Sequence, residues 1–314
     1  MNGSLQSLER HTANFCPEQG PTNTSAFTFP RTVLGRFASS KELCERGTPN
    51  AEIPKASALC NITTRVFNAP NNLSCTLTLD VIDAEISGVS VEKKKSLASS
   101  AQILTSRPER LTPKNITNAV NIANMLLSSE NISTDIAVST VATVSQLLSA
   151  RPEKFPDVDC KALSKLTQTL QNFSLREESN NLVQSNLAVQ SFKGGQEIHQ
   201  VQLTLFKATG NDTFIPGNDT FIPGRIKLDS NMMPFPKEKV DLQMNITFSE
   251  GMNKSVGFVL YDSDRFFPSQ NFTPSLNTKR RVFSANLFEN GFDTIEVQFS
   301  VTPSVVEKFV TSIK

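Results

Sequence analysis

Tryptophan is absent from this chain of 314 residues, tyrosine occurs once, and histidine occurs only twice. The histidines, His11 and His199, are far apart in the sequence and form no pattern that predicts a Ser-His-Asp triad. No P-loop, no HExxH motif and no glycine-rich phosphate fingerprint occurs. A glycan hydrolase would need a pair of facing carboxylates, and the spacing of the acidic residues identifies none. These absences predict that the chain is not an enzyme and has no catalytic, cofactor-binding or metal-binding residues.

Long apolar runs and an excess of one charge are also missing. No stretch of 18 apolar residues occurs, so the sequence predicts no membrane-spanning helix. The 31 basic and 30 acidic residues leave a net charge of +1, which argues against a nucleic-acid partner. The polar start at residues 1–4 lacks the basic and apolar regions of a secretory signal. Because the cysteines and the sequons favour the secretory route, we expect this start to be truncated or misannotated.

Five cysteines are present, and four of them lie within the first 75 residues. No two are spaced as C-x-x-C, so a zinc site is disfavoured. Two disulfides in an oxidising compartment fit better, formed among Cys16, Cys44, Cys60 and Cys75. Three pairings of these four residues are possible, and the sequence does not choose between them. Cys160 is left over, and we expect it to be a buried thiol.

Asn-x-Ser/Thr sequons occur twelve times along the chain. With 26 Asn residues and 62 Ser or Thr residues, chance alone would produce about five. The excess favours passage through the secretory route over the alternative of a chain that is merely rich in these residues. Apart from the sequon at Asn2, the candidates for N-glycosylation are Asn23, Asn61, Asn72, Asn115, Asn131, Asn172, Asn211, Asn218, Asn245, Asn253 and Asn271.

The pattern of apolar residues changes twice along the chain. Residues 1–80 hold the clustered cysteines and few apolar stretches, which predicts a small module stapled by disulfides. Residues 81–178 are predicted to be helical, with apolar stripes near the 3.6-residue period within 116–127, 137–148 and 163–173. Thr112 before Pro113 is a helix start signal.

From about residue 179 the apolar period becomes two, and turn residues separate the runs. Alternating segments at 201–205, 240–246, 256–261, 282–287 and 295–301 predict a β-sandwich over residues 179–305, followed by a tail at 306–314. The dense run 256–261 is predicted to be a central strand. The predicted fold class is therefore α+β: a disulfide-stapled module, a helical subdomain and a β-sandwich.

Short segments of the chain resemble, in the same order, the extracellular region of adhesion G-protein-coupled receptors. In that family a helical bundle and a β-sandwich form subdomains A and B of the GAIN domain. The resemblance extends from about residue 12 to residue 302. It rests on strings such as Thr12–Cys16, Ala101–Ser106, Thr143–Leu148, Asn186–Ser191 and Gly257–Tyr261.

The resemblance implies a receptor region on the extracellular face of the plasma membrane, with an extracellular protein or matrix component as ligand. In the family, subdomain B ends in a proteolysis motif with paired cysteines and tryptophans, but this chain has no Trp and no cysteine after Cys160. We therefore expect an incomplete subdomain B that lacks the cleavage site, the tethered agonist and the transmembrane helices. Such a chain would not signal, and a G protein would be contacted only through the missing transmembrane part. The alternative is a secreted soluble glycoprotein that acts as a decoy or cell-adhesion module.

Overall fold

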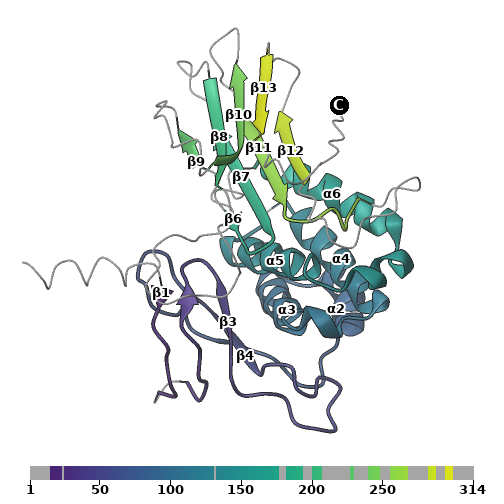
Figure 1. Ribbon diagram of the computed structural model, residues 1–314. Helices are drawn as coiled ribbons and strands as arrows, with labels where there is room; N and C mark the ends of the chain where they lie inside the picture. Colours follow the sequence, from purple (N-terminus) through teal and green to yellow (C-terminus); the bar gives the residue numbers. More distant parts are fainter. Residues whose placement is uncertain are drawn as a thin grey trace, which may run out of the picture.

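The computed structural model describes ten stretches of the chain: residues 15–22, 25–130, 132–176, 182–193, 200–206, 227–229, 240–247, 255–267, 282–287 and 294–299. Within them it shows a cysteine-rich module, a helical bundle and two sheets (Figure 1). Several sequence predictions concern positions outside the described residues. These are both histidines, the predicted tail and the sequons at Asn2, Asn23, Asn131, Asn211, Asn218, Asn253 and Asn271.

The cysteine-rich module is built from short strands because its sequence offers few apolar residues. It pairs β1 (Phe15–Cys16) with β2 (Thr32–Val33), and orders β3 (Phe37–Ser39), β4 (Ala56–Leu59) and β5 (Asn71–Asn72) in a second sheet. Its own buried cluster is small and consists of Phe29, Ala38, Ala56 and Ala58. Disulfides join Cys16 to Cys60 and Cys44 to Cys75, which confirms the prediction of a stapled module.

Removing either disulfide is expected to destabilise this module strongly. The bridges close loops with sequence separations of 44 and 31 residues, so each restricts the unfolded chain considerably. Replacing Cys44 and Cys75 together by serine should lower the free energy of unfolding by about 2–4 kcal/mol. Denaturant unfolding of the secreted variant measures this loss. Replacing the exposed Cys160 by serine is the matched control and should change stability by less than about 0.5 kcal/mol.

The helical region contains five α-helices in its described residues, where the sequence predicted three. They are α2 (Leu79–Glu85), α3 (Val91–Leu104), α4 (Pro113–Leu127), α5 (Thr134–Leu147) and α6 (Cys160–Ser174). Short 3₁₀-helices cover Ile86–Gly88, Pro108–Arg110 and Pro152–Asp157. The predicted start at Thr112 is confirmed, since its hydroxyl accepts a hydrogen bond from the Asn115 backbone N–H. Helix α3 escaped prediction because its buried face includes Ser99, Ser100 and Gln102, which weakens the apolar period.

Two antiparallel four-stranded sheets follow the helices, as the β-sandwich prediction expected. One has the order β12-β11-β7-β6 and the other the order β13-β10-β8-β9. Their bounds are β6 (Leu182–Val183), β7 (Leu187–Lys193), β8 (Gln200–Phe206), β9 (Lys227–Asp229), β10 (Val240–Thr247), β11 (Ser255–Tyr261), β12 (Val282–Leu287) and β13 (Thr294–Phe299). Strand β11 is central, because Phe258 pairs with Gln190 on one side and with Ala285 on the other.

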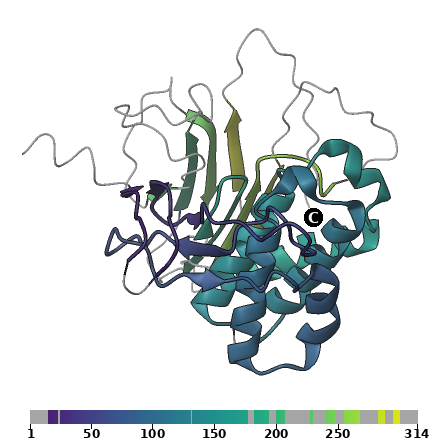
Figure 2. The same ribbon diagram turned by 90° about the horizontal axis from the view of Figure 1, so that it is seen from below.

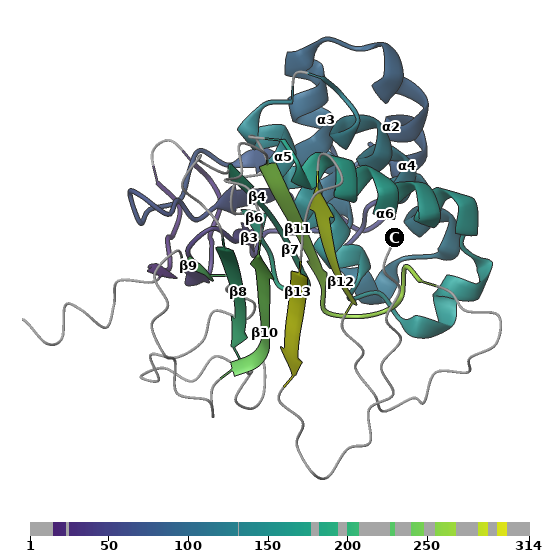
Figure 3. The same cartoon turned by 90° about the horizontal axis from the view of Figure 1, so that it is seen from above.

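The bundle covers one face of the β12-β11-β7-β6 sheet. Helix α6 runs beside β11 and β12, and strands β8, β10 and β13 lie on the side away from the helices (Figure 3). Gly257 allows this close approach, since a Cβ atom there would lie 2.6 Å from the backbone of Ser174 in α6. The segment after β11 returns to the bundle as well, where the Arg265 guanidinium donates to the Leu148 carbonyl at the end of α5.

One hydrophobic core runs through all three regions. It includes Cys44 and Ile53 from the module, residues from every described α-helix, and Val259 and Tyr261 from β11. The view from below shows the module lying against the bundle (Figure 2). The module is thus held by the bundle as well as by its disulfides. The domain boundaries drawn at residues 80 and 178 stay predictions.

The hydroxyl of Tyr261 is buried and has no hydrogen-bond partner among the described residues, although its ring packs at 5.1 Å, centroid to centroid, on Phe267. Burial raises the pKa of this phenol, so it stays protonated under alkaline conditions. We expect Tyr261→Phe to raise the free energy of unfolding by about 1 kcal/mol, since an unsatisfied polar group is removed and the ring is kept. Urea unfolding at neutral pH measures this gain. A loss of stability would mean that the hydroxyl is satisfied in solution.

Candidate ligand-binding surface

The described residues contain no constellation that predicts catalysis or metal chemistry. No group of three or more His, Cys, Asp or Glu side chains in the described stretches could hold a metal ion. None of the described helices has both the length and the apolar character needed to cross a membrane. Two neighbouring cavities beside α2 provide a surface suited to binding.

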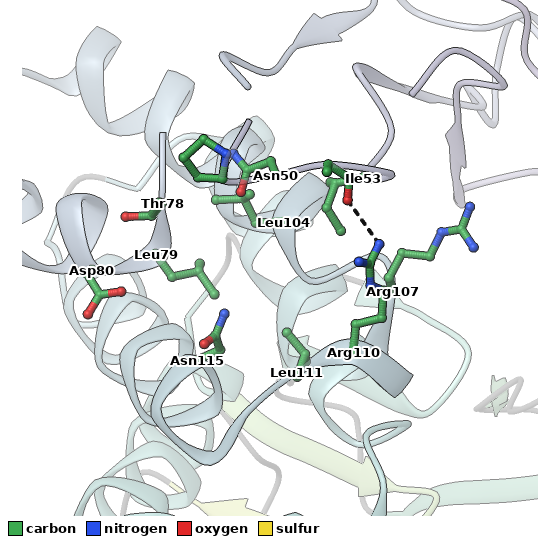
Figure 4. A pocket seen from close by; sticks show the side chains of 12 residues that line it. Asn50, Ile53, Thr78, Leu79, Asp80, Leu104, Arg107, Arg110, Leu111 and Asn115 are labelled. Carbon is green, nitrogen blue, oxygen red and sulfur yellow. Dashed lines mark hydrogen bonds between the residues drawn. The ribbon is translucent and has the colours of Figure 1, made fainter. Parts of the chain in front are cut away.

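The first cavity, which we call the seam cavity, lies where the module meets the bundle and has a volume of about 230 Å³. One wall is the module segment 49–53, and the other walls are the start of α2, the end of α3 and the start of α4 (Figure 4). Apolar side chains form much of the lining, and charged or amide groups complete it. The polar lining residues are Asn50, Thr78, Asp80, Arg107, Arg110 and Asn115.

Hydrogen bonds fix the two sides of the seam cavity against each other. Arg110 donates to the Ala51 carbonyl at 3.0 Å and pairs with the Glu52 carboxylate at 3.2 Å. The Asn50 amide donates to the Leu77 carbonyl at 2.6 Å, just before α2 begins. Glu52 itself has a φ of +67°, an uncommon conformation for a residue with a side chain. The seam is thus a defined junction and not a flexible tether.

The second cavity, which we call the helix cavity, lies between α2, α4 and α6 and has a volume of about 450 Å³. Positions three apart on a helix share a face, so α2 presents Asp80 and Asp83 together, and α4 presents Asn118 and Asn121 together. The Asn121 amide donates to the Asp83 carboxylate at 3.3 Å. Lys165 of α6 adds a positive charge to the lining.

Deeper in the helix cavity, Asn124 is almost completely buried at 3% exposure. Its amide nitrogen donates to the Ala162 carbonyl at 3.2 Å, whereas its carbonyl oxygen accepts no hydrogen bond from any described residue. Carboxylate, amide and ammonium groups line this cavity together, and they offer both donors and acceptors of hydrogen bonds. The helix cavity therefore suits a polar ligand that both donates and accepts hydrogen bonds.

Asp80 lines both cavities and joins them into one surface. Its carboxylate is paired with the Lys114 ammonium. Hydrogen bonds from Lys114 and then Asn118 lower the pKa of Asp80, although the carboxyl is solvent-exposed. A carboxyl with a lowered pKa stabilises the fold above its unfolded-state pKa, and this contribution is lost as the pH falls through the folded-state pKa. At neutral pH the Asp80 carboxylate is therefore ionised, and it lies on the same surface as the ammonium groups of Lys114 and Lys165.

The described sequons fall into different surroundings. Asn72 and Asn172 are exposed, whereas Asn61 and Asn115 are half-buried. The Asn61 carbonyl oxygen accepts from the backbone N–H groups of Thr63 and Thr64, so this side chain shapes its own turn. Asn245 lies in β10, where only the backbone is described. Glycosylation at each of these positions remains a prediction.

The expectation that Cys160 is a buried thiol is wrong. The structure places it at the first position of α6, where the free thiol is exposed. The reason is where the buried face of α6 starts: it begins at Ala162 and continues through Leu166 and Phe173. Cys160 lies before this stripe, in the capping turn whose Asp159 side chain accepts the Lys161 N–H.

The sequence patterns do not predict this surface. Asp80 and Asp83 belong to a helix of only seven residues, which is too short to show a clear apolar period, so the pattern does not reveal that they share a face. A signal does exist in α4, where Asn118, Asn121 and Asn124 recur every three residues within an apolar pattern. These regularly spaced asparagines on a largely buried helix indicate a polar face along which α4 does not pack closely against its neighbours.

Models of one receptor match almost the whole chain. They are described as the N-terminal domain of GPR128, GPR128 GAIN subdomain A and GPR128 GAIN subdomain B, and they match residues 8–75, 79–175 and 181–301. The chain is 27% identical over 287 residues to the adhesion G-protein coupled receptor G7 of Mus musculus, covering 88% of the chain and 35% of the relative. It is 27% identical over 308 residues to the Homo sapiens receptor of that name, covering 92% and 37%.

A solved structure titled as the full extracellular region of zebrafish Gpr126/Adgrg6 is also similar, with a TM-score of 0.47 and 16% identity. The similarity covers 87% of this chain and 34% of the solved chain. The chain thus spans about a third of the length of the curated relatives it matches. Because the three consecutive models follow the order of module, bundle and sheets seen in the structure, the chain belongs to the adhesion G-protein-coupled receptors and corresponds to their GAIN-containing extracellular region.

Proposed function

We propose that this chain is the adhesion or ligand-binding region of a cell-surface receptor, displayed on the extracellular side of the plasma membrane. Its ligand is an extracellular protein or a matrix component. Two disulfides support this location, since such bonds persist in oxidising compartments. The similarity to adhesion receptors supports the role.

The observation that carries the proposal is the continuity between the module and the bundle. Cys44, Ile53 and Leu73 of the module pack in the same hydrophobic core as the helices. The hydrogen bond of 2.8 Å between Ser57 and Gln102 links the two regions at a buried position. A rigid junction holds the polar surface around Asp80 in one shape, and a preformed surface loses less entropy when a ligand binds.

Charge reversal in the helix cavity tests this proposal. The tagged and dimerised chain is applied to live cells and to deposited extracellular matrix, and bound protein is measured by fluorescence. Lys165→Glu should reduce binding at least fivefold, because the substitution places a third acidic side chain beside Asp80 and Asp83. Lys161→Glu is the matched control, since it makes the same charge change on α6 outside both cavities. Equal binding by the two variants, or no binding by the parent chain, would refute the proposal.

We also propose that these 314 residues bind ligand without cleaving themselves or signalling. The sequence after residue 160 contains neither the cysteines nor the tryptophans that accompany the cleavage motif in the family. Secreted chain analysed under reducing conditions should therefore run as one species of undivided length. Appearance of two fragments with a defined junction within residues 181–314 would contradict this.

A further inference from the structure

The asparagine of one sequon lines the seam cavity. Asn115, Ile116 and Thr117 form the motif, and the Asn115 side chain lines the cavity at the first turn of α4. We propose that Asn115 carries an N-glycan whose first N-acetylglucosamine occupies the seam cavity and joins the cysteine-rich module to the bundle. This inference rests on the proposed extracellular role, because N-glycans are added in the secretory route.

The Asn115 side chain has the orientation that this attachment needs. Its carbonyl oxygen accepts a hydrogen bond from the Thr112 hydroxyl, which holds the amide in place. Its amide nitrogen, the atom that a glycan modifies, has no hydrogen-bond partner in the described part of the chain. In Figure 4 this nitrogen points into the space between Leu79 and Leu111. A sugar attached there would enter the cavity and not the bulk solvent.

The lining of the cavity matches one sugar ring. Leu79, Leu104 and Leu111 offer an apolar surface for the C–H face of the ring. In Figure 4 the Arg107 guanidinium points outward, and rotation of this exposed side chain would bring its N–H donors to the hydroxyl and acetamide oxygens of the sugar. Arg107 is exposed and forms no ion pair with any described residue. The volume of about 230 Å³ is below the roughly 300–1,000 Å³ typical of pockets for drug-sized ligands. The space therefore fits the first sugar, and the outer sugars would leave along the polar rim.

The other described sequons lack this arrangement. The Asn61 amide nitrogen already donates to the Asn68 carbonyl oxygen at 3.0 Å. Asn72 and Asn172 are exposed, and neither lines the seam cavity or the helix cavity. Glycans on these two residues would extend into solvent. Among the sequons whose side chains are described, Asn115 alone combines an available nitrogen with a cavity that can receive a sugar.

Resistance to deglycosylation tests the inference. The 314-residue chain is secreted from mammalian cells behind an added leader, and glycopeptide mass spectrometry reports occupancy at each sequon. The folded chain is then treated with the amidase that hydrolyses the bond between Asn and the first sugar. We expect removal at Asn115 to be at least tenfold slower in the folded chain than in the reduced and denatured chain. Removal at the exposed Asn72 and Asn172 should differ less than threefold between the two states.

A second variant separates sugar docking from simple crowding. Arg107→Ala removes the donors and keeps the apolar lining, so protection of the Asn115 glycan should fall by at least threefold. Arg151→Ala, an exposed arginine outside both cavities, is the matched control and should leave protection unchanged.

The outcomes distinguish this inference from the proposed function. If Asn61, Asn72 or Asn172 is glycosylated but Asn115 is bare, or if its glycan is removed equally fast from folded and denatured chain, the inference is wrong and the extracellular role stands. If protection is unaffected by Arg107→Ala, the sugar is shielded without being bound, and the docking is refuted. If no sequon is occupied in secreted chain, both the inference and the support that sequons lend to the extracellular role are lost.

Discussion

Replacing Gly257 with alanine is expected to reduce the yield of folded, secreted chain severely. A Cβ atom at this position would lie 2.2 Å from the Ser174 hydroxyl oxygen and 2.6 Å from the backbone carbonyl carbon and oxygen of Ser174. The backbone of α6 cannot move away without opening the core that contains Leu170 and Phe173. The loss of unfolding free energy should be about 3 kcal/mol or more, at the upper end for overpacked cores.

Gly88 provides the matched control. A Cβ atom at Gly88 meets nothing within 4 Å, so Gly88→Ala should change stability by less than about 1 kcal/mol. Thermal unfolding of both purified variants, with secretion yield as a second readout, makes the comparison. Adding Ser174→Gly to Gly257→Ala removes the hydroxyl contact but leaves the backbone contacts, so it should rescue the variant only in part. Equal stability of the two alanine variants would mean that α6 does not lie on β11 as described.

Phe258→Ala should be the second severe substitution. The side chain is completely buried in the central strand β11, and its ring stacks on Phe283 of β12 with centroids 5.9 Å apart. Truncation removes this packing and leaves a cavity, which typically costs about 3–5 kcal/mol for a buried phenylalanine. Alternation along the strand places Phe258 on the face opposite Gly257 and Tyr261. The loss therefore comes from the face of the sheet that the helices do not cover.

Urea unfolding measures the Phe258 effect. Ile62→Ala is the control, because this side chain is 65% exposed in the module and its truncation should cost less than about 0.5 kcal/mol. A Phe258→Ala loss below about 1 kcal/mol would show that β11 is not a central strand in solution. Unchanged m-values would indicate that both variants still unfold as the parent chain does.

Much of the secondary structure follows from local patterns in the sequence. The start of α4 at Thr112 and Pro113 needs only a capping hydroxyl and a fixed φ, both of which are properties of neighbouring residues. The dense apolar run 256–261 predicts a central strand, and β11 occupies it almost residue for residue. Local patterns did not predict helix α3, because small and polar side chains on its buried face hide the apolar period.

The candidate surface could not be predicted in this way. Asp80 and Asn121 are 41 positions apart, and they meet only because α2 packs across α4. The Asn115 amide is held by the nearby Thr112, but the cavity that it faces exists only because the module segment 49–53 packs against the bundle. Such proximities arise from long-range packing, which residue spacing does not encode.

The sequence by itself determined the order of module, helices and sheets, since hydrophobic periodicity and cysteine clustering are local properties. The tertiary structure alone decided which cysteines pair, why position 257 is glycine, and where two cavities open beside Asp80. The physical reason is that each of these features depends on atoms from distant segments coming within a few ångströms of one another. Close packing of the shared core brings them to that distance.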